Sequence, residues 1–251
     1  MRCPVPLLPL AAAVVTAAVA VAVGATPAAA RTDDVVASRD VQQVGTYDYL
    51  TSPADYTGLA PVSAVGSTPT LGLGTFDHLD GELVLVGGRY YRIGTDGHPQ
   101  EFDPARTTPF LQTIHFVPDV SGPVPPGTTC AQLVTTVNAL AGADTGVVAV
   151  RVRGTFSDLV TRSVPAQSEP YAPLAQVVAT QTLFHLGQQR AVLVGFRTGQ
   201  DFAGVGAPGL HLHGVTADRS AGGHVISCVA GPDVQLSVER AGGVRILSGG
   251  D

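Results

Sequence analysis

Short apolar runs, rich in β-branched residues and bounded by Gly, Pro or Asp, recur along most of this chain. Runs of this kind predict β-strands. They are "TLGLGTF" (70–76), "ELVLVGG" (82–88), "RYYRI" (89–93), "TIHFV" (113–117), "GVVAVRVRG" (146–154), "RAVLVGFRT" (190–198), "GLHLHGV" (209–215), "GHVISCVAG" (223–231), "VQLSVER" (234–240) and "GVRIL" (243–247). The pattern therefore predicts a protein dominated by β-sheet.

Two segments have helical spacing instead. In "GTTCAQLVTTVNALAG" (127–142), Thr128 or Thr129 can cap a helix that ends at Gly142. In "YAPLAQVVATQTLFHLG" (171–187), Pro173 suits the first turn and Gly187 the end. We expect both helices to pack an apolar face on a sheet, which gives a mixed α/β fold of the α+β type.

A faint internal repeat suggests two related halves. "GTFDHL" (74–79) recurs as "GTFSDL" (154–159), and Glu82 and Arg162 each stand eight positions after the glycine of their copy. A duplication would give two structurally related halves, about 46–140 and 141–251, each a mixed β-sheet with flanking helices. It would also place one acid and one base at equivalent positions, although a match this short also arises by chance.

The first thirty residues carry one arginine, a long apolar run and a small-residue end at Ala28–Ala30. This pattern predicts a secretory signal peptide at 1–30. A retained membrane anchor is the alternative, but no basic stop-transfer cluster follows, so we expect no stable membrane insertion after cleavage. Residues 31–45 are polar and unpatterned and predict a flexible lead-in to a domain at 46–251. The mature protein is then secreted or otherwise extracytoplasmic.

The composition excludes one class of partner and leaves a disulfide open. The formal charge is −6, and loss of Arg2 with the signal makes it one unit more negative. An acidic exported chain without a basic patch is not expected to bind nucleic acid. Cys130 and Cys228 survive in the mature chain. Export permits a disulfide between them, but the sequence alone leaves open whether they meet.

Three of the seven histidines lie in "PGLHLHGVTADRSAGGHV" (208–225). A strand points His211 and His213 to one face, and the turn-rich stretch after them can bring His224 onto a neighbouring strand. Three imidazoles leave coordination positions open, as in a catalytic zinc site. A polar stripe on a solvated sheet face is the alternative for the H-x-H pair alone.

The remaining histidines carry weaker signals. We expect surface or core roles for His98 in a turn, His115 in a strand and His185 near a helix end. His78 precedes Glu82 by four positions and is a second candidate for proton delivery. Taken singly, Glu82 and Arg162 are more often solvated charges, and their matched repeat positions make them candidates.

Five separated motifs together resemble the α-acetolactate decarboxylase family: "LGLGTFDHLDGEL", "RGTFSDLVTRSVP", "EPYAPLAQVV", "LVGFRT" and "PGLHLHGVTADRSAGGHV". The resemblance implies a zinc enzyme that decarboxylates the small-molecule substrate (S)-2-acetolactate to (R)-acetoin and CO₂, in acetoin and butanediol formation. It implies a mixed α and β fold with two related halves, and a homodimer.

The resemblance also implies roles for individual residues. His211, His213 and His224 match the zinc ligands of the family, and Glu82 and Arg162 match the glutamate and arginine that line its site. We expect Arg162 to hold the carboxylate or hydroxyl of the substrate and Glu82 to relay a proton.

Family members usually add another glutamate from a longer tail. Here the late acids are Asp233, Glu239 and Asp251, and none of them is assigned to the site. Two alternatives follow: a secreted, non-catalytic metal-binding module that kept the fold, and a cupin-like oxygenase. The second would need a carboxylate ligand after the histidine pair, where the sequence has Asp218 in a turn.

Overall fold

The computed structural model describes Met1, residues 38–142 and residues 144–247. The predicted signal peptide, apart from Met1, lies outside the described residues, and so does most of the predicted lead-in. The described residues from 38 onward belong to one compact unit. None of the described helices is long and apolar enough to cross a membrane.

One sheet is built mainly from the first half of the chain. It has seven strands in the order β16-β1-β8-β3-β4-β5-β6. Their bounds are β1 (Val41–Val44), β3 (Leu71–Thr75), β4 (Glu82–Val86), β5 (Arg89–Ile93), β6 (Pro99–Gln100), β8 (Leu111–Ile114) and β16 (Val244–Leu247). Strand β16 comes from residues 244–247 and pairs in parallel with β1, so the second half of the chain contributes a strand to this sheet.

The second sheet has seven strands from residue 120 onward. The order is β12-β13-β14-β10-β15-β9, with β11 paired to β10. The bounds are β9 (Val120–Pro123), β10 (Val147–Ser163), β11 (Thr182–His185), β12 (Gln189–Thr198), β13 (Gly209–Thr216), β14 (Gly222–Ala230) and β15 (Gln235–Arg240). A two-stranded sheet joins β2 (Ala60–Pro61) and β7 (Thr107–Thr108). The predicted mixed fold class, dominated by strands, is confirmed.

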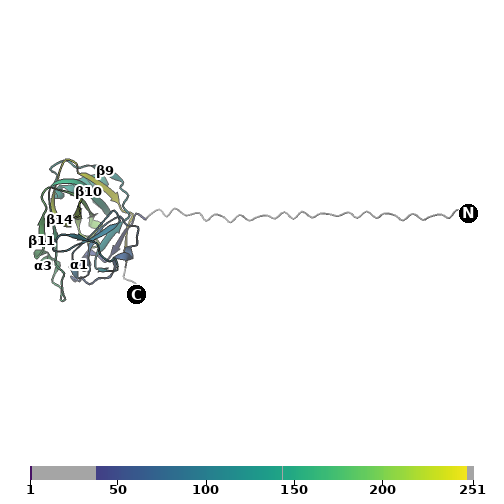
Figure 1. Cartoon of the computed structure of the whole chain (residues 1–251), viewed down its shortest axis with the longest axis horizontal. Helices are drawn as coiled ribbons and strands as arrows, with labels where there is room; N and C mark the ends of the chain where they lie inside the picture. Colours follow the sequence, from purple (N-terminus) through teal and green to yellow (C-terminus); the bar gives the residue numbers. More distant parts are fainter. Residues whose placement is uncertain (2–37, 143, 248–251) are drawn as a thin grey trace. The chain divides into compact units, whose positions relative to one another are not determined.

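Strand β10, labelled in Figure 1, organises the second sheet, because it changes partners along its length. Its first part pairs with β12 and its last part with β14. Gly154 lies near the end of the part that pairs with β12; its φ is +147°, and a Cβ there would lie 2.7 Å from the Cα of Val234. The pairing with β14 begins at Phe156 and brings Arg162 opposite His224.

The two sheets enclose one core, and a helix covers the outer face of the second sheet. Ala149 of β10 packs with Leu71 and Phe110 of the first half. The alternate residues Val148 and Val150 pack on the other face with a cluster that includes Leu133 and Val137 of α2 (Cys130–Ala141). This alternation is the expected pattern for a strand buried on both faces.

The first predicted helix is confirmed and the second is wrong in its second half. Helix α2 starts after Thr129, whose hydroxyl accepts from the Gln132 amide, and ends at Gly142. Helix α3 covers only Leu174–Ala179, and β11 follows it. The physical reason is that residues 182–185 pair with the far end of β10, so tertiary strand pairing overrides the helical spacing.

The predicted lead-in at 31–45 is wrong for its last residues. Val41 and Val44 are fully buried in β1, and the polar Gln43 between them is also buried because its amide donates to the Gly45 and Val205 carbonyls. A short helix that the sequence did not reveal, α1 (Tyr47–Thr51), follows with Thr46 as its N-cap. These elements add the 40–51 region to the folded unit.

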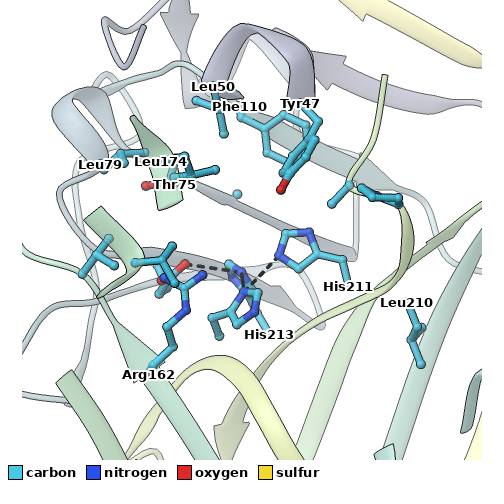
Figure 2. Close-up of a pocket in the computed structure, with 17 residues that line it drawn as sticks. Tyr47, Leu50, Thr75, Leu79, Phe110, Arg162, Leu174, Leu210, His211 and His213 are labelled. Atoms are coloured by element: carbon cyan, nitrogen blue, oxygen red, sulfur yellow. Dashed lines mark hydrogen bonds and ion pairs between the residues drawn. The ribbon is translucent and has the colours of Figure 1, made fainter. Parts of the chain in front are cut away.

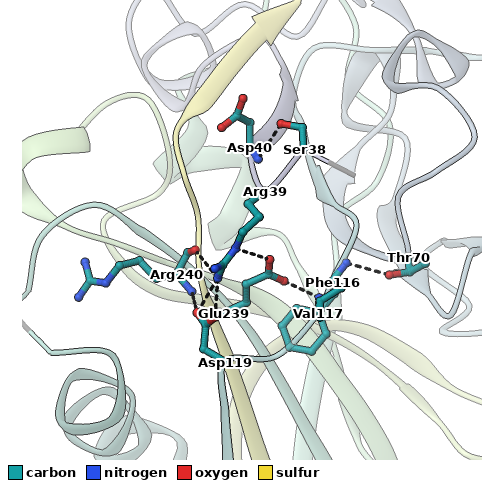
Figure 3. A network of polar contacts seen from close by, with 9 residues as sticks. All are labelled: Ser38, Arg39, Asp40, Thr70, Phe116, Val117, Asp119, Glu239 and Arg240. Carbon is teal, nitrogen blue, oxygen red and sulfur yellow. Dashed lines mark hydrogen bonds and ion pairs between the residues drawn. The ribbon is translucent and has the colours of Figure 1, made fainter. Parts of the chain in front are cut away.

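A polar network holds the start of the described chain against β15 (Figure 3). The Arg39 guanidinium contacts Asp119 at 2.6 Å and Glu239 at 3.3 Å. Glu239 is fully buried and accepts the Val117 amide at 2.6 Å. Burial raises the pKa of Glu239, and the Val117 amide and Arg39 oppose that rise.

The question of the two cysteines is answered by the structure. Cys130 at the start of α2 forms a disulfide with Cys228 of β14, with Cα atoms 5.0 Å apart. The bond joins positions separated by 98 residues and fixes the outer helix to the strand that carries His224. Cys3 lies outside the described residues.

Candidate active site and metal centre

The structure brings His211, His213 and His224 together. His211 and His213 share one face of β13, and His224 of β14 is the direct cross-strand partner of His213. One ring nitrogen from each residue lies within 4.8 Å of the other two. The two-strand arrangement expected from the sequence is therefore the arrangement in the fold.

The spacing of these nitrogens fits a single metal ion. His211 Nε2 lies 3.1 Å from His224 Nδ1, which lies 3.3 Å from His213 Nε2. Tetrahedral ligands with metal–nitrogen bonds of about 2.0–2.1 Å would be roughly 3.3 Å apart. The three rings thus need only small movements to hold a metal between them.

The protonation states also suit metal binding. His213 Nδ1 lies 2.8 Å from the Leu83 carbonyl, so it carries the proton and leaves the lone pair on Nε2. Burial lowers the pKa of His211 to about 3, with a further contribution from the positive charge of Arg162. Burial also lowers the pKa of His213 and His224. The rings are therefore neutral at physiological pH, and neutral imidazoles are the form that binds metals.

Glu82 and Arg162 adjoin the histidines as a close pair of opposite charges. Arg162 NH1 lies 3.5 Å from Glu82 Oε1, and Glu82 Oε2 lies 3.4 Å from His213 Nε2. Burial raises the pKa of Glu82 to about 7, against the opposing effect of Arg162. The Nε of Arg162 is buried without a hydrogen-bond partner, so the guanidinium retains a free donor.

The two sheets contribute these charges from opposite sides. Glu82 begins β4, opposite Thr75 in the β3–β4 hairpin, while Arg162 lies on β10 opposite His224. Gly223 permits the close approach of β14 to β10: its φ is +131°, and a Cβ there would lie 2.4 Å from the Arg162 carbonyl oxygen. A larger residue at 223 would push the His224 strand away from Arg162.

These residues line a cavity of about 320 Å³ between the sheets. Its floor holds the polar groups, and its walls are largely apolar (Figure 2). The full lining is Tyr47, Leu50, Gly74, Thr75, Leu79, Glu82, Phe110, Arg162, Val164, Leu174, Val178, Ala207, Pro208, Leu210, His211, His213 and His224. Glu82 is the one acid among the described residues of this lining.

Two further polar residues line the cavity, Tyr47 and Thr75, and neither was expected from the sequence. The Tyr47 hydroxyl points toward His211 from the opposite wall (Figure 2). It forms no hydrogen bond with any described residue. The Thr75 hydroxyl donates to the Gly81 carbonyl at 2.8 Å and so fixes the peptide before Glu82. Thr75 could have been found from the hairpin register, but no local signal marked Tyr47.

The late acids that the structure describes lie outside the cavity. Glu239 belongs to the Arg39 network, and Asp233 accepts the Thr155 amide at 2.7 Å. Asp251 lies outside the described residues. Asp218 accepts the Thr216 hydroxyl and the Ser220 amide within its turn. Asp218 therefore stabilises the turn and is not positioned as the carboxylate ligand that a cupin-like oxygenase would need.

The other histidines take no part in the cavity. His78 Nδ1 bonds to the Tyr171 hydroxyl at 2.6 Å, on the exposed side of the turn before Glu82. His98 bonds to the Ser220 carbonyl, and His115 follows the end of β8 and bonds to the Thr68 carbonyl. His185 lies in strand β11 and not near a helix end, so that expectation is wrong.

Comparison with known proteins identifies the family of the chain. A family model described as alpha-acetolactate decarboxylase matches residues 41–247, which include all five residues predicted for the site. This chain belongs to that family. The resemblance found in the sequence motifs is therefore confirmed.

Individual members of the alpha-acetolactate decarboxylase family give the same result. The alpha-acetolactate decarboxylase of Methanosarcina mazei is 38% identical over 190 residues, which are 76% of this chain and 66% of the relative. That of Bacillus subtilis is 31% identical over 191 residues, or 75% of each protein. The aligned part thus spans about two thirds to three quarters of these relatives.

Solved structures match the fold. The crystal structure of alpha-acetolactate decarboxylase from Bacillus subtilis strain 168 superposes with a TM-score of 0.78 at 29% identity, over 83% of this chain and 88% of that one. A Staphylococcus aureus protein of unknown function similar to alpha-acetolactate decarboxylase has a TM-score of 0.76 at 24% identity. The second match supports the fold alone.

Proposed function

We propose that this chain decarboxylates (S)-2-acetolactate to (R)-acetoin and CO₂, with a zinc ion held by His211, His213 and His224. Membership of the family supports acetolactate as the substrate. The observation that carries the proposal is the juxtaposition of Glu82 and Arg162 beside three neutral histidines in one cavity. Burying these two charges is costly, and a chemical role gives a reason for it.

Arg162 is placed to orient the substrate. Its side chain is largely buried, and its unpartnered Nε can donate to a carboxylate or hydroxyl oxygen. A guanidinium binds a carboxylate through two parallel charge-assisted hydrogen bonds. Arg162 would thereby hold the bond between C2 and the carboxylate carbon perpendicular to the plane of the neighbouring ketone. In that orientation the electron pair of the breaking bond can overlap with the carbonyl as CO₂ leaves.

The bound zinc would supply a positive charge that stabilises the electron density left on the ketone and hydroxyl oxygens. One ring nitrogen of each of the three imidazoles lies within 4.8 Å of the other two, and neutral ligands would leave the charge of the ion undiminished. The hydrogen bond from His213 Nδ1 to the Leu83 carbonyl holds its ring in place.

Glu82 is placed to complete the reaction. Once the carbon–carbon bond has broken, one proton must be added to carbon to give acetoin. The Glu82 carboxyl stands between Arg162 and His213, at 3.5 and 3.4 Å, so it reaches the same volume as the substrate oxygens. Burial raises the pKa of Glu82 to about 7, so its protonated carboxyl can donate this proton to the carbon that CO₂ has left, and a proton from water then restores the carboxyl.

The apolar walls suit the two methyl groups of acetolactate. Leu79, Phe110, Leu174 and Val178 line the cavity above the charged floor. A small substrate bound there excludes water from Glu82 and Arg162, which strengthens their electrostatic interactions with it.

The test is to incubate the purified mature chain with racemic acetolactate and to measure acetoin by chiral gas chromatography. We expect (R)-acetoin from the wild type and none from a His213→Ala variant, with His98→Ala, whose histidine lies outside the cavity, as the matched control. Bound metal without any acetoin would instead support the non-catalytic metal-binding alternative. The same assay on (S)-acetolactate alone tests the proposed stereochemistry, which formation of (S)-acetoin would refute.

We also propose that the protein acts outside the cytoplasm. The Cys130–Cys228 disulfide supports this location, because such bonds persist in oxidising compartments. Mass spectrometry of the exported protein would identify its first residue, for which we predict Arg31. The homodimer implied by the resemblance stays a prediction, which light scattering of the purified protein would test.

A further inference from the structure

A second cavity, of about 170 Å³, lies at the junction of the two sheets and is separate from the catalytic one. Two of its lining residues are arginines from the same face of β10. Arg151 and Arg153 are two positions apart, so the alternation of the strand points both to one side. Their cross-strand partners on β12, Val194 and Val192, also line the cavity.

Neither arginine has a counter-charge among the described residues. No carboxylate of those residues lies within ion-pair distance of either guanidinium, and neither donates a hydrogen bond to them. The Nε of Arg151 is buried without a partner, although this residue is half-buried. Its guanidinium lies over the Phe116 ring, with 5.0 Å from the guanidinium carbon to the ring centroid.

The charges are also unfavourable to one another. Burial lowers the pKa of Arg151, and the positive charge of Arg153 lowers it further. A partly buried donor without an acceptor destabilises a fold. A pair of guanidiniums that share a cavity without an acid between them has the character of an anion site.

From this pair of unpartnered guanidiniums in an otherwise apolar cavity, we infer that residues 151 and 153 form a binding site for a small aliphatic carboxylate. The carboxylate would accept from Arg151 and Arg153. Its alkyl group would pack on Phe116, Val192 and Val194. The inference is independent of the proposed function, since none of these residues lines the catalytic cavity.

The apolar walls favour a carboxylate over an inorganic oxyanion. Leu71 and Val86 of the first sheet complete the apolar lining, and Thr70, whose hydroxyl accepts the Phe116 amide at 3.0 Å, is the one uncharged side chain of the described lining that carries a donor. Phosphate or sulfate would need donors on several sides, whereas a carboxylate needs them on one. Burial of an alkyl group adds about 25 cal/mol for each Å² removed from water.

Isothermal titration calorimetry of the full mature chain with isobutyrate tests the inference, with isobutyramide and inorganic phosphate as comparison ligands. We expect one saturable site in the millimolar range. The amide, which has the same shape but no charge, should bind at least about tenfold more weakly, because a charge-assisted hydrogen bond contributes about 1.5–3 kcal/mol. Phosphate binding as tight as that of isobutyrate would overturn the assignment to carboxylates.

Variants locate the site. Arg151→Gln and Arg153→Gln should each weaken isobutyrate binding about tenfold or more, while Arg245→Gln, at an exposed arginine on β16, should leave it unchanged. Arg153 is exposed, so its replacement keeps the test valid even if Arg151→Gln impairs folding. Isobutyrate could also enter the catalytic cavity. Binding that survives both variants but is lost in Arg162→Gln would overturn the inference, as would the absence of saturable binding.

Discussion

Glu82 and Arg162 approach each other from two different sheets, with Oε1 and NH1 3.5 Å apart at the floor of one cavity. Each also adjoins a histidine: Glu82 lies 3.4 Å from Nε2 of His213, and Arg162 is the cross-strand partner of His224. Glu82 and Arg162 thus each lie beside one of the candidate metal ligands, in the same cavity.

Replacement of Arg162 by lysine should preserve the charge and remove the planar pair of donors. We expect Arg162→Lys to keep its metal and its fold but to lose at least about tenfold in kcat/KM, equivalent to about 1.4 kcal/mol of transition-state stabilisation. Steady-state acetoin formation measures the effect, and Arg190→Lys at an exposed site is the matched control. Turnover close to wild type in Arg162→Lys would make this residue structural.

Glu82→Gln keeps the shape of the side chain and removes its proton-transfer capacity. Because Glu82 is the one acid of the described cavity lining, the loss of kcat should lie at the upper end of the usual range of about 10²–10⁴-fold. Metal content should not change, since the three histidines remain. The control is Glu101→Gln at an exposed position.

If Glu82→Gln retains more than about a tenth of wild-type turnover, its contribution falls below the usual range for a general acid or base. Another group would then supply the proton. The variant His78→Ala tests whether His78 is that group. Because His78 bonds to Tyr171 outside the cavity, we expect near-normal turnover in this variant.

Tyr47 offers a hydroxyl without a described partner above the histidines. We predict that it donates a hydrogen bond to a substrate oxygen, so Tyr47→Phe should lower kcat/KM about tenfold, in line with about 1–1.5 kcal/mol for one hydrogen bond. Tyr49→Phe on the same helix is the control, because the Tyr49 hydroxyl faces the Thr57 carbonyl instead. Equal kinetics in the two variants would contradict this role.

The disulfide should contribute to stability by restricting the unfolded chain. A crosslink between positions 98 residues apart is worth about 4–5 kcal/mol in the chain-entropy description. Reduction should therefore lower the Tm by roughly 10 °C, measured by calorimetry with and without a phosphine reductant. A Cys130→Ala/Cys228→Ala variant should melt at the same temperature in both buffers. An unchanged Tm of the wild type on reduction would contradict the prediction.

The site could be predicted from the sequence where it depends on local spacing. The period of two along a strand places His211 and His213 on one face, and a turn between two strands brings His224 opposite His213. The meeting of Glu82 with Arg162 is different. It depends on the packing of two sheets, so it could be expected only from the repeat and the family resemblance. The two copies of the repeat in fact differ locally: the first leaves its strand for a 3₁₀ turn, and the second stays within β10.

The errors of prediction also have physical causes. Residues 182–185 have helical spacing but gain more from pairing with β10. Residues 41–44 contain two glutamines, so their sequence does not predict a buried strand. Gln43 is buried because its side-chain amide donates to the distant Val205 carbonyl, a contact that the sequence does not reveal. Tyr47 enters the cavity because its backbone amide bonds to the Val205 carbonyl, a long-range contact that no local pattern encodes. In each case a partner far away in the chain determines the structure.

We propose that zinc held by His211, His213 and His224 is required for the decarboxylation of acetolactate. This requirement is tested most directly by elemental analysis combined with activity, on protein purified without a histidine tag or added metal. The account predicts about one zinc per chain, loss of acetoin formation when a chelator removes it, and recovery in proportion to the zinc restored. Folded protein that contains no metal and still forms acetoin at the wild-type rate would contradict it.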